Sequence, residues 1–151
     1  MGPFGGILPA VPAQDLSDET FIVATPERIS VVVHDPERWR QWWPDLELRI
    51  FMDRAERGIR WSVSGSFTGS NEIWLEPVGD GTLVHYFLRV DPANGGSLSP
   101  RRAAAVRRSR ALSWKRWVNA LKDELEAGRA AAMPASGSSS RPTGSVPSKP
   151  E

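Results

Sequence analysis

The feature that most constrains the fold of this chain is a long stretch near its C-terminus, from Ser99 to Arg129, which predicts one helix. Ser99-Pro100 is a start signal, because Ser caps a helix and Pro fits the first helical position without losing a needed N–H. No Gly or Pro follows until Gly128, which we interpret as the stop. At about 1.5 Å per residue such a helix is roughly 40 Å long, enough to cross a small domain.

Helical periodicity places an apolar stripe on one face of this segment, and two arginines interrupt the stripe. Its apolar members are Ala103, Val106, Trp114, Trp117, Val118, Leu121 and Leu125. Arg107 and Arg110 fall on the same face. Because a buried, unpaired guanidinium is very costly, each of the two needs an anion, water or a carboxylate as its partner.

Charge is distributed unevenly, although the net charge is only +1. Residues 1–100 carry 8 basic and 14 acidic residues, whereas residues 101–129 carry 9 basic and 3 acidic residues. Either the basic helix and the acidic remainder attract each other within one fold, or the helix meets an anionic partner. The chain has no Cys and only 2 His, so we expect neither a disulfide nor a metal site.

The rest of the chain predicts a strand, two short helices and four antiparallel strands. The strands are 19–24, 46–53, 59–64, 67–76 and 83–91, with a hairpin turn at 78–82, and the helices begin at Thr25-Pro26 and Asp35-Pro36. This order predicts an α+β fold, a curved antiparallel sheet of about five strands wrapped round the long helix. We assign residues 1–16 to a flexible N-terminal arm, 17–129 to the domain and 130–151 to a disordered tail.

Four kinds of segment are not found in this sequence. It has no run of about 18 apolar residues and no basic leader of the signal-peptide type, so a cytoplasmic protein is expected. It also has no glycine-rich phosphate loop after a strand and no nucleophile elbow. We therefore expect no cofactor.

Several motifs resemble the START-like (SRPBCC) superfamily, in particular its bacterial polyketide cyclase/dehydrase and lipid-transport group. They are residues 24–29 (ATPERI), 35–39 (DPERW), 42–44 (WWP) and 75–82 (LEPVGDGT). The resemblance covers roughly residues 18–127 and implies the helix-grip fold with a ligand cavity between sheet and helix. It implies no universal catalytic residue. Fuller members have six strands between the second and the long helix, where this chain has four, which implies a smaller or more open cavity.

The candidate ligand-binding residues are those expected around such a cavity. They are Arg107, Arg110, Trp114, Trp117, Trp61 and Trp74. Arg offers bidentate geometry for a carboxylate, phosphate or enolate. Alternatively the arginines pair with Glu72, Glu47 or Asp91 across the sheet or extend out to solvent at one end, and the tryptophans fill the space that a ligand would take.

His85 and Tyr86 are weaker, catalytic candidates. Neighbouring strand residues face opposite sides, so only one of the two faces the cavity. His85 would serve there as an acid or base, and Tyr86 as a donor to a developing oxyanion. We interpret His34, at a helix end, as structural.

Three functions follow from these candidates. The first is binding of a small hydrophobic or lipid-like ligand with an anionic group. The second is a cofactor-free polyketide cyclase, aromatase or dehydratase. The third is a protein or RNA interaction module that uses Arg101, Arg108 and Lys115 on the basic helix face. A small hydrophobic molecule or lipid is the expected partner, nucleic acid is not favoured, and a homodimer is left open.

Overall fold

The computed structural model of the protein describes residues 12–132. Its elements are β1 (Gln14–Ile22), α1 (Pro26–Val33), α2 (Pro36–Trp42), β2 (Glu47–Asp53), the 3₁₀ helix η1 (Ala55–Arg57), β3 (Gly58–Ser64), β4 (Phe67–Val78), β5 (Gly81–Pro92) and α3 (Pro100–Ala132). The order is the predicted one, with a 3₁₀ helix in the turn after β2. Most of the predicted arm and nearly all of the predicted tail lie outside the described residues.

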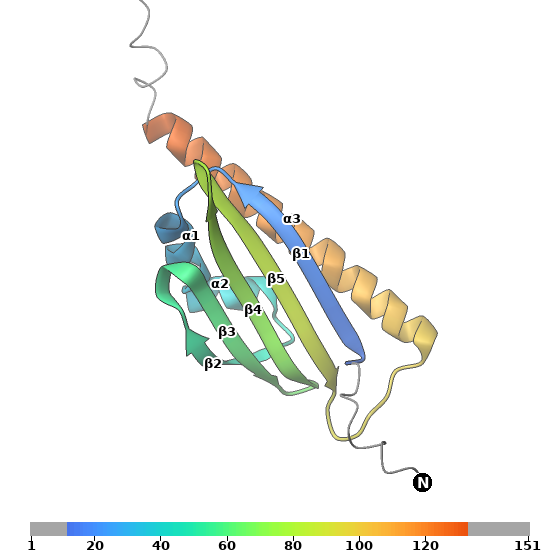
Figure 1. The fold of residues 1–151 in the computed structure, drawn as a ribbon. Coiled ribbons are helices and arrows are strands. Elements are labelled where there is room, and N and C mark those ends of the chain that lie inside the picture. Colours follow the sequence, from blue (N-terminus) through green and yellow to red (C-terminus); the bar gives the residue numbers. More distant parts are fainter. Residues whose placement is uncertain (1–11, 133–151) are drawn as a thin grey trace, which may run out of the picture.

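The five strands form one antiparallel sheet in the order β1-β5-β4-β3-β2 (Figure 1). The two longest strands, β4 and β5, are joined by the two-residue turn Gly79-Asp80. Gly79 has a φ of 56°, the left-handed geometry that such a tight hairpin requires. The sheet confirms the predicted α+β architecture and its number of strands.

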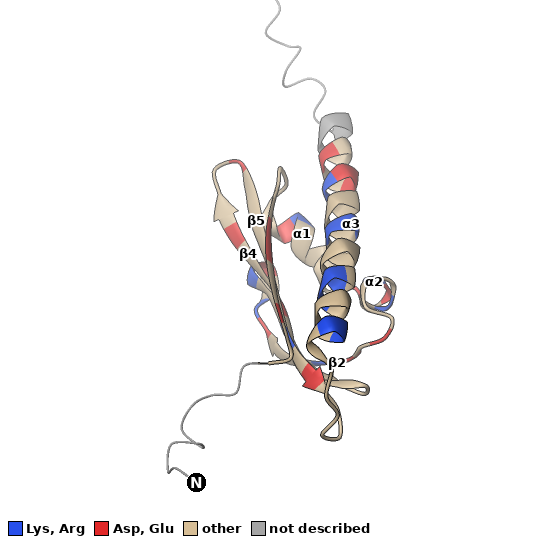
Figure 2. Ribbon diagram, turned by 90° about the vertical axis from the view of Figure 1, so that its right-hand side faces the viewer, with Lys and Arg blue, Asp and Glu red and all other residues tan. Residues whose placement is uncertain are grey.

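All three helices lie on one face of the sheet (Figures 1 and 2). The long helix α3 runs lengthwise beside β1, while α1 contacts β3 and β4 and α2 contacts α3. The apolar side chains of this sheet face and of the helices meet in a single core. No helix of the described chain covers the other face of the sheet.

The helix starts follow the capping signals in the sequence. The side chain of Thr25 accepts a hydrogen bond from the N–H of Arg28, and that of Asp35 accepts one from Glu37. The Ser99 hydroxyl accepts one from the N–H of Arg102 at the start of α3. A proline occupies the first turn of α1 and α2 and begins α3.

The predicted stop of α3 at Gly128 is wrong, because the helix continues to Ala132. A glycine inside a helix costs only about 1 kcal/mol relative to alanine. The residues that follow, 130–132, are all alanine, the best helix former, so the helix continues through the glycine.

The first strand begins at Gln14, five residues before the predicted start, so residues 14–16 belong to the sheet and not to the arm. Gln14 pairs with Val90 of the long strand β5, and its side-chain amide donates to the carbonyl of Ala103 at 3.0 Å. These partners are distant in sequence. The local pattern therefore contained no signal for the extension.

The alternating pattern of β2 predicted a buried apolar face, and the structure buries little of it. Leu48 is half-buried towards the helices, but Ile50, Phe51 and Met52 are exposed. The pairing with β3 shifts by one residue between Ile50 and Met52. As the edge strand furthest from α3, β2 lies against the short helix α2 near Leu48, and its last residue, Asp53, contacts His34 at the end of α1.

Candidate functional site

The two arginines of the α3 stripe have different positions. The Arg110 side chain is only 13% exposed, and its Nη2 lies 2.6 Å from Oδ2 of Asp45, in the loop between α2 and β2. Its guanidinium also lies over the ring of Phe67, at 5.2 Å. Arg107 is exposed and donates to the backbone carbonyl of Asp15. The prediction that Arg107 faces a cavity is therefore wrong, because its side chain extends past the edge strand β1.

Arg110 lines a pocket of about 390 Å³ between α3, the sheet and the α2–β2 loop. Its walls are Trp42, Trp43, Pro44, Asp45, Phe67, Tyr86, Arg102, Val106, Ser109, Arg110, Ser113 and Trp114. We call it the α3 pocket. Apolar side chains dominate its walls, and a few polar groups converge on it, which is the usual composition of a small-molecule site.

The electrostatics of the α3 pocket centre on the Arg110–Asp45 pair. The Asp45 side chain is 57% exposed, so the pair lies at the mouth and is only weakly stabilising. The Nε of Arg110 is buried and has no hydrogen-bond partner within the described part of the chain. Asp45, the ion-pair partner of Arg110, is not one of the carboxylates that the sequence suggested, which were Glu72, Glu47 and Asp91. An entering anion would compete with Asp45 for the guanidinium.

Tyr86 faces the α3 pocket and His85 does not. Tyr86 is almost completely buried. Burial raises the pKa of Tyr86 far above its ordinary value and Asp45 adds to this, while Arg110 and a hydrogen bond with Trp43 act in the opposite direction. The phenol therefore stays protonated at neutral pH and remains a hydrogen-bond donor.

His85 lies on the outer face of the sheet, the face without helices. Its Nε2 is 2.9 Å from Oε1 of Glu76, and its Nδ1 is 3.4 Å from Oε1 of Glu19. Its ring stacks on Trp74 at 4.5 Å. His85 is therefore not an acid or base for chemistry in the α3 pocket.

Packed aromatic rings fill much of the space between α3 and the sheet. Trp43 packs edge-on against Trp61 at 5.2 Å and stacks on Trp114 at 5.9 Å. Tyr86 stacks on Trp114 at 4.2 Å, and Trp42 packs edge-on against the same ring. These rings occupy the centre of the domain, so the α3 pocket is confined to the end of the core near the N-terminal half of α3.

Of the predicted set, Trp114 and Arg110 line the α3 pocket. Trp61 is fully buried in the core, and Trp117 is half-buried against it. The prediction for Trp74 is wrong, because its side chain lies on the outer face, stacked on His85. The side chains at 73 and 75 take the inner face instead, and strand alternation places 74 opposite.

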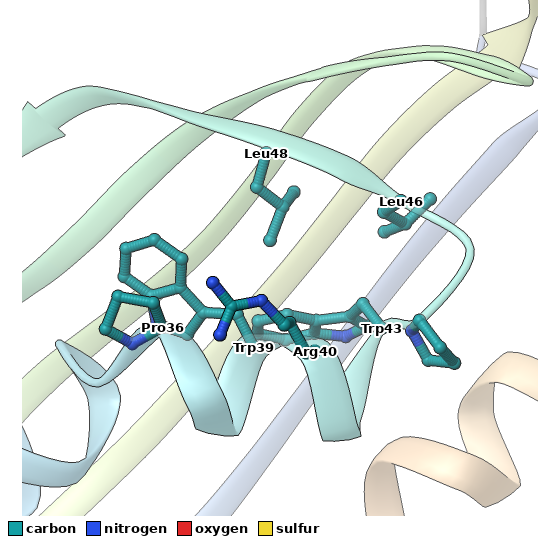
Figure 3. Close-up of a pocket in the computed structure, with 7 residues that line it drawn as sticks. Pro36, Trp39, Arg40, Trp43, Leu46 and Leu48 are labelled. Carbon is teal, nitrogen blue, oxygen red and sulfur yellow. The ribbon is translucent and has the colours of Figure 1, made fainter.

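A second hollow, of about 460 Å³, lies between α2 and the edge strand β2 (Figure 3). Its walls are Pro36, Trp39, Arg40, Trp43, Pro44, Leu46 and Leu48. We call it the α2–β2 hollow. It shares Trp43 and Pro44 with the α3 pocket, so the Trp43 side chain lies between the two. The sequence signal for it was the WWP motif followed by leucines at alternating positions.

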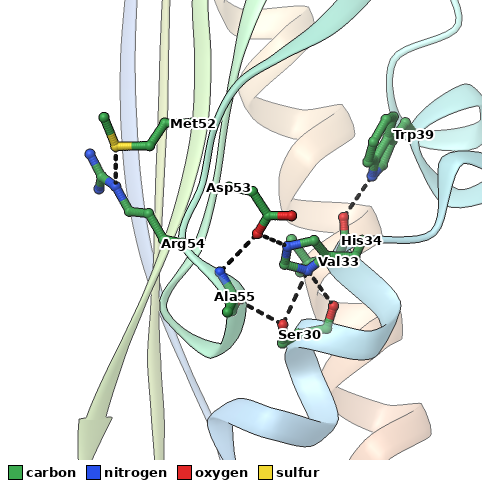
Figure 4. A network of polar contacts seen from close by, with 8 residues as sticks. All are labelled: Ser30, Val33, His34, Trp39, Met52, Asp53, Arg54 and Ala55. Carbon is green, nitrogen blue, oxygen red and sulfur yellow. Dashed lines mark hydrogen bonds and ion pairs between the residues drawn. The ribbon is translucent and has the colours of Figure 1, made fainter.

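Ser30, His34 and Asp53 form a polar network that superficially resembles a hydrolase triad (Figure 4). His34 Nε2 is 2.9 Å from Oδ1 of Asp53, and its Nδ1 is 2.8 Å from the carbonyl of Ser30. Since Nδ1 must donate to that carbonyl, it cannot also accept a proton from the Ser30 hydroxyl. The hydroxyl instead donates to the carbonyl of Ala55. The network joins α1 to η1, which agrees with a structural role for His34.

Two kinds of functional feature are absent from the described residues. Residues 12–132 contain no group of three or more His, Asp or Glu side chains that would hold a metal ion. None of the helices in this range is both long and apolar enough to traverse a bilayer.

Comparisons with known proteins reveal the fold. No family model matches the sequence, and no curated protein matches it. Among solved structures, a START superfamily protein from Mycobacterium smegmatis aligns with a TM-score of 0.57 at 16% identity, over 74% of this chain and 97% of that one. The chain has the START-like, helix-grip fold.

Other structures with this fold agree. A protein from Deinococcus radiodurans aligns with a TM-score of 0.57 at 14% identity, over 76% of this chain and 99% of that one. A protein of the dynemicin biosynthetic locus aligns with a TM-score of 0.51 at 15% identity, over 76% of this chain and 48% of that one. At these identities the likeness establishes the START-like fold and not an activity.

Proposed function

We propose that this START-like protein binds a small amphiphilic molecule in the α3 pocket, with its apolar part against the tryptophans and an anionic group at Arg110. The observation that carries the proposal is a nearly buried guanidinium, with one N–H unpaired, in the wall of a pocket that is lined mainly by aromatic and aliphatic side chains. A pocket of about 390 Å³ falls within the range that holds small ligands.

The chemistry at Arg110 favours a carboxylate over a neutral polar group. An entering carboxylate would accept a hydrogen bond from the free Nε–H and displace the exposed Asp45. The ion pair between Arg110 and Asp45 would then be replaced by an ion pair between Arg110 and the ligand. Tyr86, whose hydroxyl stays protonated, would donate to the same anion. A neutral ligand would leave the Arg110–Asp45 pair intact and would gain only apolar contact.

A binding function is better supported than a cyclase or dehydratase function. The stronger candidate acid or base, His85, lies on the far side of the sheet from the α3 pocket. Of the two candidates only Tyr86 is at the pocket, and its raised pKa makes it a donor and a poor base. The carboxylate in the pocket wall, Asp45, is already paired with Arg110, so the wall is better suited to hold an anion than to remove a proton.

The test is isothermal titration calorimetry with dodecanoate, below its micelle concentration, at pH 7.5. Arg110→Ala is expected to weaken binding by about tenfold to a hundredfold, since a hydrogen bond to a charged group contributes roughly 1.5–3 kcal/mol. Arg108→Ala is the matched control, because it removes an exposed arginine from the same helix. The proposal is refuted if dodecanoate fails to bind, or if it binds the two variants equally.

A second candidate function is RNA binding, which the basic face of α3 supports. Every charged residue in its N-terminal half is Lys or Arg (Figure 2). Arg101, Arg108 and Arg116 form no ion pair with any residue between 12 and 132. Lys115, predicted to belong to this face, is instead held by Asp18 at 2.9 Å.

Fluorescence anisotropy with a single-stranded RNA oligonucleotide tests this second function. If the arginines bind phosphates, affinity should fall steeply as salt is raised, and Arg101→Glu with Arg108→Glu should abolish it. Equal binding by the parent and the double variant would exclude it. Dodecanoate binding should be the same in both, because neither arginine lines the α3 pocket.

A further inference from the structure

The core contains an amide with no partner. Asn71 lies in the middle of β4, is 0% exposed, and neither Nδ2 nor Oδ1 forms a hydrogen bond with any residue that the structure describes. Directly opposite in β3 is Trp61, also fully buried, whose Nε1 is likewise without a partner. Buried polar groups are nearly always hydrogen-bonded, because leaving them unpaired costs free energy. Three such atoms on two residues that are paired across neighbouring strands therefore require an explanation.

The strand register places Asn71 on the inner face of the sheet, the face that forms one wall of the α3 pocket. Phe67 and Tyr86 are the two sheet residues that line the pocket. Phe67 and Asn71 are on the same face of β4 as Ile73, and Ile73 is paired with Tyr86. Asn71 thus lies along the strand between the two sheet residues of the pocket wall.

Between Phe67 and Asn71 this face of β4 has no side chain. The residue there is Gly69, with a φ of 150°, and a Cβ on it would come within 2.0 Å of the carbonyl oxygen of Arg89. Only glycine fits this backbone. The sheet surface that leads from the pocket wall towards Asn71 is therefore bare of side chains at this position.

Trp43 packs over this part of the inner face of the sheet. Its ring centroid lies 5.2 Å from that of Trp61, which is paired with Asn71, and 5.6 Å from that of Tyr86, which is paired with Ile73. The same indole is the partition between the α3 pocket and the α2–β2 hollow. A rotation of Trp43 into the hollow would join the two spaces over Trp61 and Asn71 without unfolding any strand.

We propose that Asn71 and Trp61 form a polar subsite for a hydroxyl group of the ligand, under Trp43. The three unpaired atoms are two donors, Trp61 Nε1–H and an Asn71 Nδ2–H, and one acceptor, Asn71 Oδ1. A hydroxyl oxygen accepts two hydrogen bonds and its proton donates one, so a single hydroxyl satisfies all three. A carbonyl would satisfy only the donors, and a methyl group none. The ligand class is therefore a hydroxylated amphiphilic acid.

This inference rests on the proposed function, since the hydroxyl belongs to the same ligand whose anion is at Arg110. The experiment compares dodecanoate with 3-hydroxydodecanoate and 12-hydroxydodecanoate by titration calorimetry. One of the two hydroxy acids should bind about fivefold or more tightly than dodecanoate, since a good hydrogen bond provides about that factor. Asn71→Leu, of nearly the same size, should abolish that preference and leave dodecanoate binding intact or improved.

The stability of the ligand-free protein provides an independent test of the subsite. Asn71→Leu removes two unpaired polar atoms from the core, so its unfolding midpoint in urea should equal or exceed that of the parent. Asn119→Leu, at an exposed position of α3, is the control for the substitution itself. If Asn71→Leu fails to fold, Trp61→Phe, which removes only the Nε1–H and part of the ring, should reduce the hydroxyl preference instead.

The outcomes separate the subsite from the pocket. Arg110-dependent binding of all three acids with equal affinity overturns the subsite and leaves the proposed function standing. A hydroxyl preference that survives both Asn71→Leu and Trp61→Phe also overturns the subsite. If none of the acids binds, the proposed function and the subsite both fail.

Discussion

Trp43 is the residue whose removal should be most informative about the packing of this domain. It is 5% exposed and contacts four other aromatic rings: those of Trp42, Trp61, Tyr86 and Trp114. An indole that buries about 200 Å² contributes roughly 5 kcal/mol at about 25 cal/mol per Å². Trp→Ala changes in cores cost about 3–5 kcal/mol. We expect Trp43→Ala to lower the free energy of unfolding by about 4 kcal/mol.

Trp74→Ala provides the matched comparison, because it is the same substitution on the outer face. Trp74 is half-buried and its aromatic contact is with His85, so its loss should cost only about 1 kcal/mol. Urea unfolding followed by far-UV circular dichroism measures both, since the chain has 7 Trp and its fluorescence would not report on one of them.

If Trp43→Ala leaves no folded protein, Trp43→Phe should still show a loss of about 1–2 kcal/mol. Equal destabilisation by the changes at 43 and 74 would refute the assignment of Trp43 to the centre of the core. It would also remove the argument that this indole divides the α3 pocket from the α2–β2 hollow.

Three further predictions concern single contacts. Gly69→Ala should lower the free energy of unfolding by about 2 kcal/mol or more, because the new Cβ would clash with the carbonyl oxygen of Arg89. Gly79→Ala should lower it by only about 1 kcal/mol, because no atom lies within 4 Å of the new Cβ. Urea unfolding of the two variants measures both. Asp45→Asn should raise dodecanoate affinity about twofold to fivefold in calorimetry, because the ligand no longer competes with a carboxylate for the guanidinium. A hydrogen bond from the N–H of Ala55, and then His34, lower the pKa of Asp53 below its usual 3.8. The unfolded state therefore binds the proton more readily than the folded state. The parent protein should be more stable than Asp53→Asn above pH 3.8, and this difference should vanish as the pH falls further. Thermal unfolding of both proteins at several pH values measures it.

The position of Arg110 explains why the pocket was only half predictable. Helical periodicity correctly grouped Arg110 with Trp114 on the inner face of α3, because a helix turns by a constant angle per residue. The same rule grouped Arg107 with them, yet Arg107 is level with the edge strand β1 and reaches the backbone of Asp15. Which part of a helical face is covered depends on where the sheet ends, and no local pattern contains that information.

The pair His85 and Tyr86 makes the same point for a strand. Alternation required that they face opposite sides, but it is symmetric and does not say which side is inside. That choice was made by the register with β4, where Tyr86 is paired with the buried Ile73 and His85 with Trp74. The buried, unpaired amide of Asn71 is a consequence of the same register and had no signal in the sequence.

The local chemistry of the chain thus determined where its three α-helices begin and how many strands it has. Caps at Thr25, Asp35 and Ser99 and the turn at Gly79-Asp80 act over a few bonds, so the sequence alone specifies them. The α3 pocket, its partition by Trp43 and the pairing of Arg110 with Asp45 were decided only by the tertiary structure. They depend on how rings from α2, β3, β5 and α3 share one volume, and that packing is a property of residues far apart in the chain.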